Sequence, residues 1–298
     1  MKQRIQKLLA AAGVASRRAV EEMVLQGRVS VNDQTVTRLP ILIEPGVDRV
    51  AVDGQRVKLI AAKGKAGSGR SSATGEVTGA AGLAVERVYI LLNKPKNVYS
   101  TNVAQGVQKL AIDLLPDDVP ARVYPVGRLD SQSTGLLLMT NDGELTNRLT
   151  HPRYGVAKTY RATVDGFVDD KVIRSLEGAA PVEKAAAGSA VINRRRARIR
   201  VIHRSTTRTM LEITVQESTT RDGRNRSVRQ MLAHMGHKVR ELCRTRFGPL
   251  DLGGMPPGSW RLLSREELRA LRGIAEDRIN RQDAKTPRKK IRGEELGA

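Results

Sequence analysis

A stretch of small and polar residues from Ala61 to Glu86 constrains this chain more than any other feature, because it cannot fold by itself. It includes GKAGSGRSSATGEVTGAAG and carries too few large apolar side chains to form a core. Such a composition is typical of a flexible linker. The 298 residues therefore divide into an N-terminal module, residues 1–60, a larger domain, residues 87–273, and a basic tail, residues 274–298, expected to be disordered.

The N-terminal module is predicted to contain two short helices followed by strands. Gly13 separates two segments with apolar residues at helical spacing: Ile5, Leu8, Leu9 and Ala12 in the first, and Val20, Met23 and Val24 in the second. Ser16 can cap the second helix, and valines on both sides of Asn32-Asp33 predict a hairpin.

Cations decorate this module: Arg4, Lys7, Arg17, Arg18 and Arg28. Arg17 and Arg18 fall at a helix N-terminus, where the helix dipole disfavours positive charge, so an anionic partner would offset that cost. An ordinary small helical domain with solvated arginines is the alternative.

The larger domain reads as α+β. Strands are predicted at residues 88–93, 158–164, 201–202 and 210–215, and Val228, Met231, Leu232 and Met235 form a helical stripe stopped by Gly236. Leu136 to Met139 is a short apolar run between Gly135 and the turn Asn141-Asp142-Gly143, as in a strand buried on both faces. The chain has neither regular strand–helix alternation nor a Gly-rich phosphate loop, so no nucleotide cofactor is implied.

The charge of the chain points to a polyanionic partner. Lys and Arg total 52 against 31 Asp and Glu, which gives a net charge of +21 and a pI near 10.8. A basic membrane-surface protein is the competing interpretation, but no apolar run approaches the ~20 residues of a spanning helix. No signal-peptide pattern opens the chain, so a cytoplasmic protein that binds nucleic acid is expected.

The sequence predicts neither a metal site nor a disulfide bond. Cys243 is the single cysteine, which excludes an intramolecular disulfide and a thiolate cluster. His234 and His237 lie near Cys243 along the chain, but no ligand set closes around them, so no metal site is predicted. Aromatic residues make up 3% of the chain, which disfavours a module that reads single strands by stacking bases.

One carboxylate, Asp130, stands out in the stretch GRLDSQSTGLLLMTNDGELTNRLTHPRY, because it lies among cations in the loop before the predicted buried strand. An Asp in such a loop is often only a turn residue. Two further motifs accompany it, Lys158-Thr159-Tyr160 and GRNRSVR at residues 223–229.

Together these motifs closely resemble the pseudouridine synthases that modify ribosomal RNA. SRRAVEEMVLQGRVSVNDQTV resembles the RNA-binding module, named after ribosomal protein S four, that opens one branch of this family. The resemblance covers residues 1–60 and about 87–272. It implies a small helix-pair and hairpin domain that cradles RNA, and a catalytic domain with a mainly antiparallel mixed sheet flanked by helices.

The resemblance also implies roles for individual residues. Asp130 matches the single catalytic aspartate, acting as a nucleophile or as the base that starts glycosidic cleavage; both routes stay open. Tyr160 would pack against the uracil, and Arg229 would pair with the aspartate. A buried core tyrosine and a solvated arginine are the respective alternatives. Cations expected to contact RNA are Arg128, Lys158, Arg224, Arg226 and Arg244.

Four positions depart from the family pattern: Asn97, Glu241, Ser227 and Gln230, the last two in place of the usual Gln and Arg; residues 218–222 also look inserted before the Gly-Arg-Asn-Arg motif. Asn97 stands where the Asn-Lys-Pro-x-Gly loop usually has glycine, although asparagine tolerates a left-handed backbone. Glu241 stands where an arginine is common. These changes bear on RNA placement more than on chemistry.

The sequence thus predicts an enzyme without a cofactor that isomerises one or a few uridines in ribosomal RNA, more in keeping with the large subunit. The chain is expected to be a monomer that binds ribosomal RNA or a ribosomal-subunit assembly intermediate, with no membrane partner. The alternative is a non-catalytic ribosome-assembly factor that uses both domains only to bind RNA.

Overall fold

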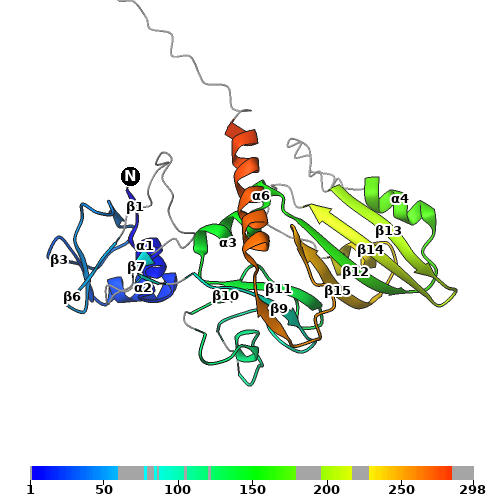
Figure 1. The fold of residues 1–298 in the computed structure, drawn as a ribbon, viewed down its shortest axis with the longest axis horizontal. Coiled ribbons are helices and arrows are strands. Elements are labelled where there is room, and N and C mark those ends of the chain that lie inside the picture. The colour runs from blue at the N-terminus through cyan, green and yellow to red at the C-terminus, as the bar shows by residue number, and fades with distance from the viewer. Residues whose placement is uncertain are drawn as a thin grey trace, which may run out of the picture. The chain divides into compact units, whose positions relative to one another are not determined.

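A computed structural model of the chain describes residues 2–59, 77–78, 84–85, 87–103, 106–119, 122–178, 196–216 and 228–283 (Figure 1). Two short strands, β7 (Val77–Thr78) and β8 (Ala84–Val85), pair antiparallel within the segment predicted as a linker. The other residues of that segment lie outside the described ones. Contacts group the chain into two compact units, residues 1–90, 101–125 and 138–143, and residues 91–100, 126–137 and 144–298.

The N-terminal module contains the two helices and the hairpin that the sequence predicts. Helix α1 spans Ile5–Ala11 and α2 spans Arg17–Leu25. The Ser16 hydroxyl accepts a hydrogen bond from the Ala19 N–H at 3.2 Å, which confirms Ser16 as the cap of α2. A sheet in the order β3-β2-β5-β6 follows, and a separate strand pair joins β1 to β4. These strands are β1 (Gln3–Arg4), β2 (Val29–Val31), β3 (Gln34–Val36), β4 (Leu42–Ile43), β5 (Val50–Val52) and β6 (Gln55–Val57).

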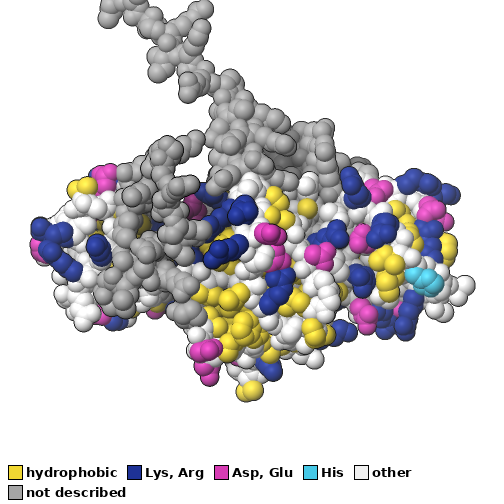
Figure 2. All heavy atoms as spheres, in the orientation of Figure 1, with side chains coloured by type: hydrophobic (Ala, Val, Ile, Leu, Met, Phe, Trp, Pro, Cys, Tyr) yellow, Lys and Arg dark blue, Asp and Glu magenta, His cyan; other side chains and the backbone are white. Residues whose placement is uncertain are grey.

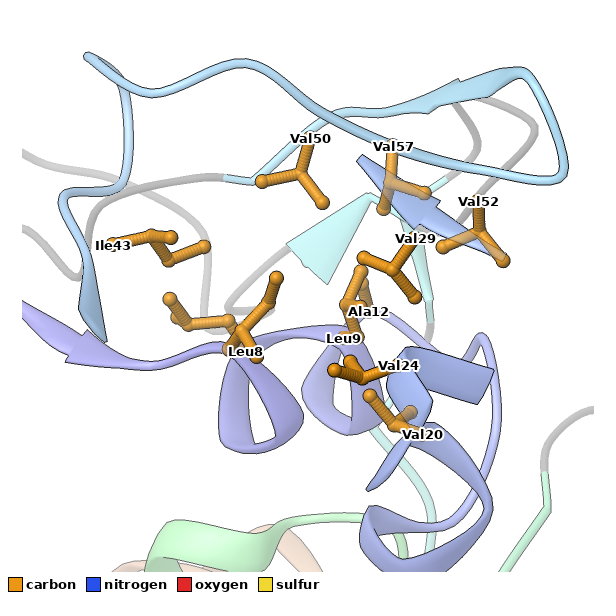
Figure 3. Close-up of a cluster of buried hydrophobic side chains, with 11 residues drawn as sticks. Leu8, Leu9, Ala12, Val20, Val24, Val29, Ile43, Val50, Val52 and Val57 are labelled. Atoms are coloured by element: carbon orange, nitrogen blue, oxygen red, sulfur yellow. The ribbon is translucent and has the colours of Figure 1, made fainter. Parts of the chain in front are cut away.

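An aliphatic core holds this module together. Figure 3 shows Leu8, Leu9, Val20 and Val24 of the helices gathered with valines of β2, β5 and β6. Leu9, Val20 and Val24 are fully buried. Burying one such side chain stabilises a fold by about 1.5–3 kcal/mol. The apolar faces of the helices therefore pack against the sheet, while Lys7, Arg17 and Arg18 stay exposed.

The larger domain is built on a nine-stranded mixed sheet, whose main path runs β13-β14-β12-β15-β11-β9-β17. Strands β11 and β15 are parallel, whereas β12 pairs antiparallel with both β14 and β15, and β13 and β14 form an antiparallel hairpin (Figure 1). The α+β fold class is therefore confirmed. The strands are β9 (Tyr89–Lys94), β10 (Tyr124–Pro125), β11 (Thr134–Thr140), β12 (Ala157–Asp165), β13 (Arg196–Arg204), β14 (Arg208–Gln216), β15 (Val239–Phe247), β16 (Leu250–Asp251) and β17 (Trp260–Leu262).

The larger domain also contains six helical segments among its described residues. They are η1 (Ile112–Leu114), α3 (Gly143–Thr150), η2 (Pro152–Tyr154), α4 (Asp170–Gly178), α5 (Val228–His234) and α6 (Arg265–Asp283). Helix α5 begins at the apolar stripe predicted from Val228. Helix α6 continues beyond residue 274, so the predicted start of the tail is wrong: the chain remains helical to Asp283. Among the described residues, no helix is both long and apolar enough to span a bilayer.

Strand β11 is buried as the sequence predicts. Leu136, Leu137, Leu138 and Met139 are all 0% exposed, so both faces of the strand are covered. The turn after the strand ties its end to β9, because the Asn141 side-chain oxygen accepts from the Val88 N–H at 3.0 Å and Asp142 accepts from the Tyr89 hydroxyl at 2.9 Å. This rigid strand fixes where the preceding loop emerges.

Candidate active site

The loop that carries Asp130 runs from β10 to β11, and Asp130 itself is exposed. Its backbone is held at both ends. Ser133 N–H donates to the Asp130 carbonyl at 2.9 Å, and the buried Ser100 hydroxyl donates to the Leu129 carbonyl at 3.1 Å and accepts from the Leu129 N–H at 3.2 Å. An exposed carboxylate on a fixed backbone suits chemistry on a bound substrate.

Lys94 lies directly beneath this loop and is fully buried. Its ammonium group donates to the carbonyls of Pro95 and Val98, each at 2.8 Å, and to that of Ser131 at 3.4 Å. Burial lowers the pKa of Lys94 to about 8, and the nearby Asp130 charge opposes that shift. Lys94 therefore joins the end of β9 to the loop and places a positive charge near Asp130.

Asn97, which is exposed, also connects the segment after β9 to the Asp130 loop. Its backbone is left-handed, with φ of 62°, which asparagine tolerates better than most residues. The Asn97 N–H donates to the Ser131 carbonyl at 2.8 Å, and the Asn97 side-chain oxygen accepts from the Gln132 amide at 2.9 Å. Asn97 thus adopts the left-handed conformation and adds a side-chain hydrogen bond to the Asp130 loop.

Arg229, on the first turn of α5, approaches the loop from the other side. It donates to the Gln132 and Val239 carbonyls, both at 3.1 Å, and to the Ser133 hydroxyl at 3.5 Å. Within the described residues it forms no ion pair with Asp130, so the pairing implied by the resemblance is not present here. The guanidinium instead connects the Asp130 loop to the start of β15.

Three neighbouring strands bring further residues into one row. Tyr160 of β12 lies opposite Arg244 of β15, and Arg244 lies opposite Gly135 of β11. A β-bulge lies between Thr159 and Tyr160, where the register against β15 shifts. Directly opposed residues project from the same face of a sheet. Tyr160 and Arg244 are therefore aligned with the strand that follows Asp130.

Arg244 does not fit its predicted role as a phosphate contact, because it is only 1% exposed. Its Nε donates to the Leu136 carbonyl at 2.8 Å, and its guanidinium lies 5.1 Å from the centre of the Phe247 ring. The Nη2 atom is buried and has no hydrogen-bond partner in the described part of the chain. An unpaired buried donor of this kind is a candidate for binding a group that arrives with a substrate.

The other predicted residues of this domain are spread around the site. Arg128 is exposed, two residues before Asp130. Lys158 and Tyr160 are half-buried on β12, and Tyr160 packs against the cluster that contains Ala162 and Leu232. Arg224 and Arg226 lie outside the described residues. The structure thus groups Asp130, Tyr160, Arg229 and Arg244 around the loop and the adjoining strands.

The predicted cations of the N-terminal module form one group of three and two separate residues. Arg4, Lys7 and Arg17 line a hollow of about 430 Å³ together with Lys2 and Glu21. Arg28 lies elsewhere and forms two hydrogen bonds to Asp53, at 2.8 and 2.6 Å, that raise the pKa of the guanidinium. Arg18 is exposed on α2. The group of three offers a concave basic surface, as expected for an anionic partner.

No three His, Cys, Asp or Glu side chains come close enough to hold a metal ion in the ranges that the structure describes. The donors and acceptors at the candidate site are instead one carboxylate, two guanidinium groups, a lysine and a phenol. That set can perform acid–base or nucleophilic chemistry, and its cations can bind an anionic group.

Comparisons with known proteins give the site a context. Residues 88–234 match the sequence family described as RNA pseudouridylate synthase, and residues 3–46 match the S4 domain. An uncharacterised RNA pseudouridine synthase of Aquifex aeolicus is 39% identical over 272 residues, which are 91% of this chain and 94% of the relative. Ribosomal large subunit pseudouridine synthase B of Bacillus subtilis is 34% identical over 92% of this chain and 97% of its own length.

A solved structure agrees with the fold. The crystal structure of a pseudouridylate synthase superimposes with a TM-score of 0.54 at 22% identity, covering 90% of this chain and 99% of that protein. This likeness concerns the arrangement of the elements. Asp130, Tyr160 and Arg229 all lie inside the part that matches the synthase family.

Proposed function

Because this chain belongs to the RNA pseudouridine synthase family, a family of isomerases that act on RNA, we propose that it converts one or a few uridines of large-subunit ribosomal RNA to pseudouridine. Two similar proteins, from Bacillus subtilis and Haemophilus influenzae, carry the name ribosomal large subunit pseudouridine synthase B. Those names support the choice of substrate.

The observation that carries the proposal is the exposed Asp130 carboxylate on a loop whose backbone is fixed from three sides. Lys94, Asn97 and Arg229 all donate hydrogen bonds to carbonyl groups of residues 131–132. A reacting group held this way loses little further freedom when a substrate binds, which lowers the entropic part of the barrier.

The reaction needs neither a redox partner nor a second substrate. The bond between C1′ of the ribose and N1 of uracil breaks, the freed base rotates, and C1′ bonds to C5. A proton leaves C5 and a proton is gained at N1, so product and substrate are isomers. Asp130 serves either as the nucleophile at the ribose or as the base that starts cleavage, and the target base is flipped out of its stack to reach it.

Tyr160 and Arg244 serve the detached base in this proposal. Tyr160 offers a flat ring near the site, against which uracil packs while it rotates. The free Nη2 of Arg244 donates to a carbonyl of the base or to the Asp130 carboxylate once water is excluded. Arg229 is a positioning residue, because it donates hydrogen bonds to the Asp130 loop and to the start of β15.

RNA is held through cations outside the site. In this proposal the exposed Arg128 contacts RNA where the target base leaves its stack, and the hollow lined by Arg4, Lys7 and Arg17 contacts phosphates. Figure 2 shows Lys and Arg side chains interspersed with Asp and Glu on the face in view. The net charge of +21 favours association with RNA in general, so site selection depends on local shape.

The proposal is tested by mapping pseudouridine after incubation of unmodified ribosomal RNA with the wild type or with Asp130→Asn. Pseudouridine is detected by carbodiimide-dependent stops of reverse transcription along both subunits' RNA. We expect one or a few new stops in large-subunit RNA with the wild type and none with Asp130→Asn, because the amide can neither attack nor take a proton.

A non-catalytic assembly factor remains the second candidate, supported by the basic hollow of the N-terminal module. It predicts binding of both proteins to RNA or to immature subunits without any new stop. Stops confined to small-subunit RNA would support the pseudouridine synthase activity but contradict the proposal that large-subunit RNA is the substrate.

A further inference from the structure

A second hollow, of about 320 Å³, opens beside the C-terminal end of α5 and is distinct from the loop that carries Asp130. Its lining residues are Arg229, Ala233, Gly236, His237, Lys238 and Val239. Two of these side chains are cationic, one is an imidazole that can donate a hydrogen bond, and none is acidic. Such a lining favours a small anion or an anionic group on a larger ligand.

The positive charge of Arg229 has no carboxylate partner in the described part of the chain. Its contacts are two carbonyls and one hydroxyl. A guanidinium has five N–H donors in a fork that matches a phosphate, so donors remain after these three contacts. The half-buried Arg229 therefore carries unneutralised charge at the wall of the hollow.

Asp165, whose backbone N–H donates to the Lys238 carbonyl at 3.0 Å, is already occupied by another cation. It binds Arg240 through two hydrogen bonds, at 2.7 and 2.9 Å. Arg240 chiefly, and Lys238 to a smaller extent, hold the pKa of Asp165 below its usual value. Arg208 acts on Asp165 in the same direction, so one carboxylate faces three cations and positive charge remains in excess beside the hollow.

Arg229 also links this hollow to the reacting group. The same guanidinium that lines the hollow donates to the Gln132 carbonyl and the Ser133 hydroxyl, in the loop that carries Asp130. An anion bound by its remaining donors would hold the guanidinium, and through it the loop, in place.

We propose that this hollow binds a phosphodiester group of the substrate RNA beside the target uridine, and that Arg229 couples its occupancy to the position of Asp130. The proposal rests on the proposed function, since it takes RNA as the ligand. It assigns Lys238 and His237 to substrate binding, and Arg229 to both binding and positioning.

The binding half is tested with an unmodified large-subunit RNA transcript and variants made on an Asp130→Asn background, so that the RNA is not converted. Lys238→Ala should weaken binding by about 3- to 10-fold and lower the slope of log affinity against log salt by about 1, as for one lost phosphate contact. Lys171→Ala, which removes an exposed lysine from α4, is the matched control and should leave the slope unchanged.

The coupling half is tested with Arg229→Lys in the otherwise wild-type chain. Lysine keeps the charge but cannot reproduce a fork that donates to Gln132, Ser133 and Val239 at once. We expect kcat to fall by about 10-fold or more while KM for the transcript stays within about 2-fold. An unchanged kcat in Arg229→Lys would contradict the proposed coupling between the hollow and Asp130.

These outcomes separate the inference from the proposed function. Equal salt slopes for Lys238→Ala and Lys171→Ala would overturn the phosphate site even if the wild type isomerises uridine. A lower slope for Lys238→Ala alone supports the site, and the slope is measured whether or not pseudouridine forms. A thermal unfolding midpoint equal to the parent's, for each variant, excludes loss of folded protein as the cause.

Discussion

At the residue scale, Asp130 takes its position from hydrogen bonds to the backbone around it. Asn97 and Lys94 hold the Ser131 carbonyl, and Arg229 holds the next one. The side chain itself projects into solvent. A fixed backbone and an exposed carboxylate suit the reacting role that we propose for Asp130.

Lys94 makes this region sensitive to pH. Its pKa is lowered from 10.5 to about 8 by burial. Below about pH 8 the folded and unfolded chains both hold the proton, and the full cost of burying the charge is present. Between about 8 and 10.5 the unfolded chain binds more protons, so stability from this group rises with pH.

Lys94→Met should abolish that contribution. The rise in the midpoint of urea unfolding between pH 8 and 10.5, followed by circular dichroism, should be smaller in Lys94→Met than in the wild type. All other titrating side chains are common to the two proteins. An equal change in both proteins would mean that Lys94 is not titrating in this range.

The family resemblance predicts Asp130 and Tyr160 as site residues, and both stay predictions, whereas the burial of Arg244 does not fit the phosphate contact predicted for it. The chain has 52 Lys and Arg residues, so an arginine by itself carries little information. A usable signal was present: Arg244 lies two residues after the buried Leu242 and so projects from the same face of β15. The contacts of Arg229 could not be predicted, because they join residues 96 and 97 positions apart in the chain.

At the element scale, the parallel contact of β11 with β15 positions the site. Gly135 makes it possible, because φ is +100° and an added Cβ would lie 2.4 Å from the Arg244 carbonyl oxygen and 2.8 Å from the Cys243 sulfur. No side chain fits there unless the strands separate. The sequence identified β11 from its apolar run, but the pairing of strands over 100 residues apart depends on the tertiary fold.

Gly135→Ala should therefore destabilise the protein by about 3 kcal/mol or more, through a steric clash and an unfavourable backbone conformation. Gly254→Ala is the control, because nothing lies within 4 Å of a Cβ built there. Urea unfolding of both variants measures the difference. A Gly135→Ala protein as stable as Gly254→Ala would contradict the close approach of β11 and β15.

Helices were predicted unevenly for a physical reason. The N-terminal helices and α5 carry long apolar stripes and clear stops, and the structure confirms them. Helix α3 (Gly143–Thr150) contributes only Leu145 and Leu149 to the interior, so its periodic signal is short. Helix α6 continues to Asp283, past the point where the sequence reads as a solvated tail, with acidic residues in its first turn.

At the scale of the whole molecule, two folded parts supply different functions. The N-terminal module has its own aliphatic core and a basic hollow, and the larger domain holds the carboxylate. Under the proposed function, an RNA-binding module in the same chain raises the effective concentration of RNA near Asp130. The composition predicted a nucleic-acid partner, but it could not show where the positive charge is left uncompensated.

The central claim, that Asp130 isomerises uridine, is tested most directly by release of tritium from ribosomal RNA labelled at C5 of its uridines. Tritium enters water only when C5 loses its hydrogen and bonds to the ribose. The wild type and Asp117→Asn, which changes an exposed carboxylate in another loop, should both release tritium in proportion to the RNA sites converted. Asp130→Asn should release none while still binding the RNA. Release by Asp130→Asn at the wild-type rate would contradict the account.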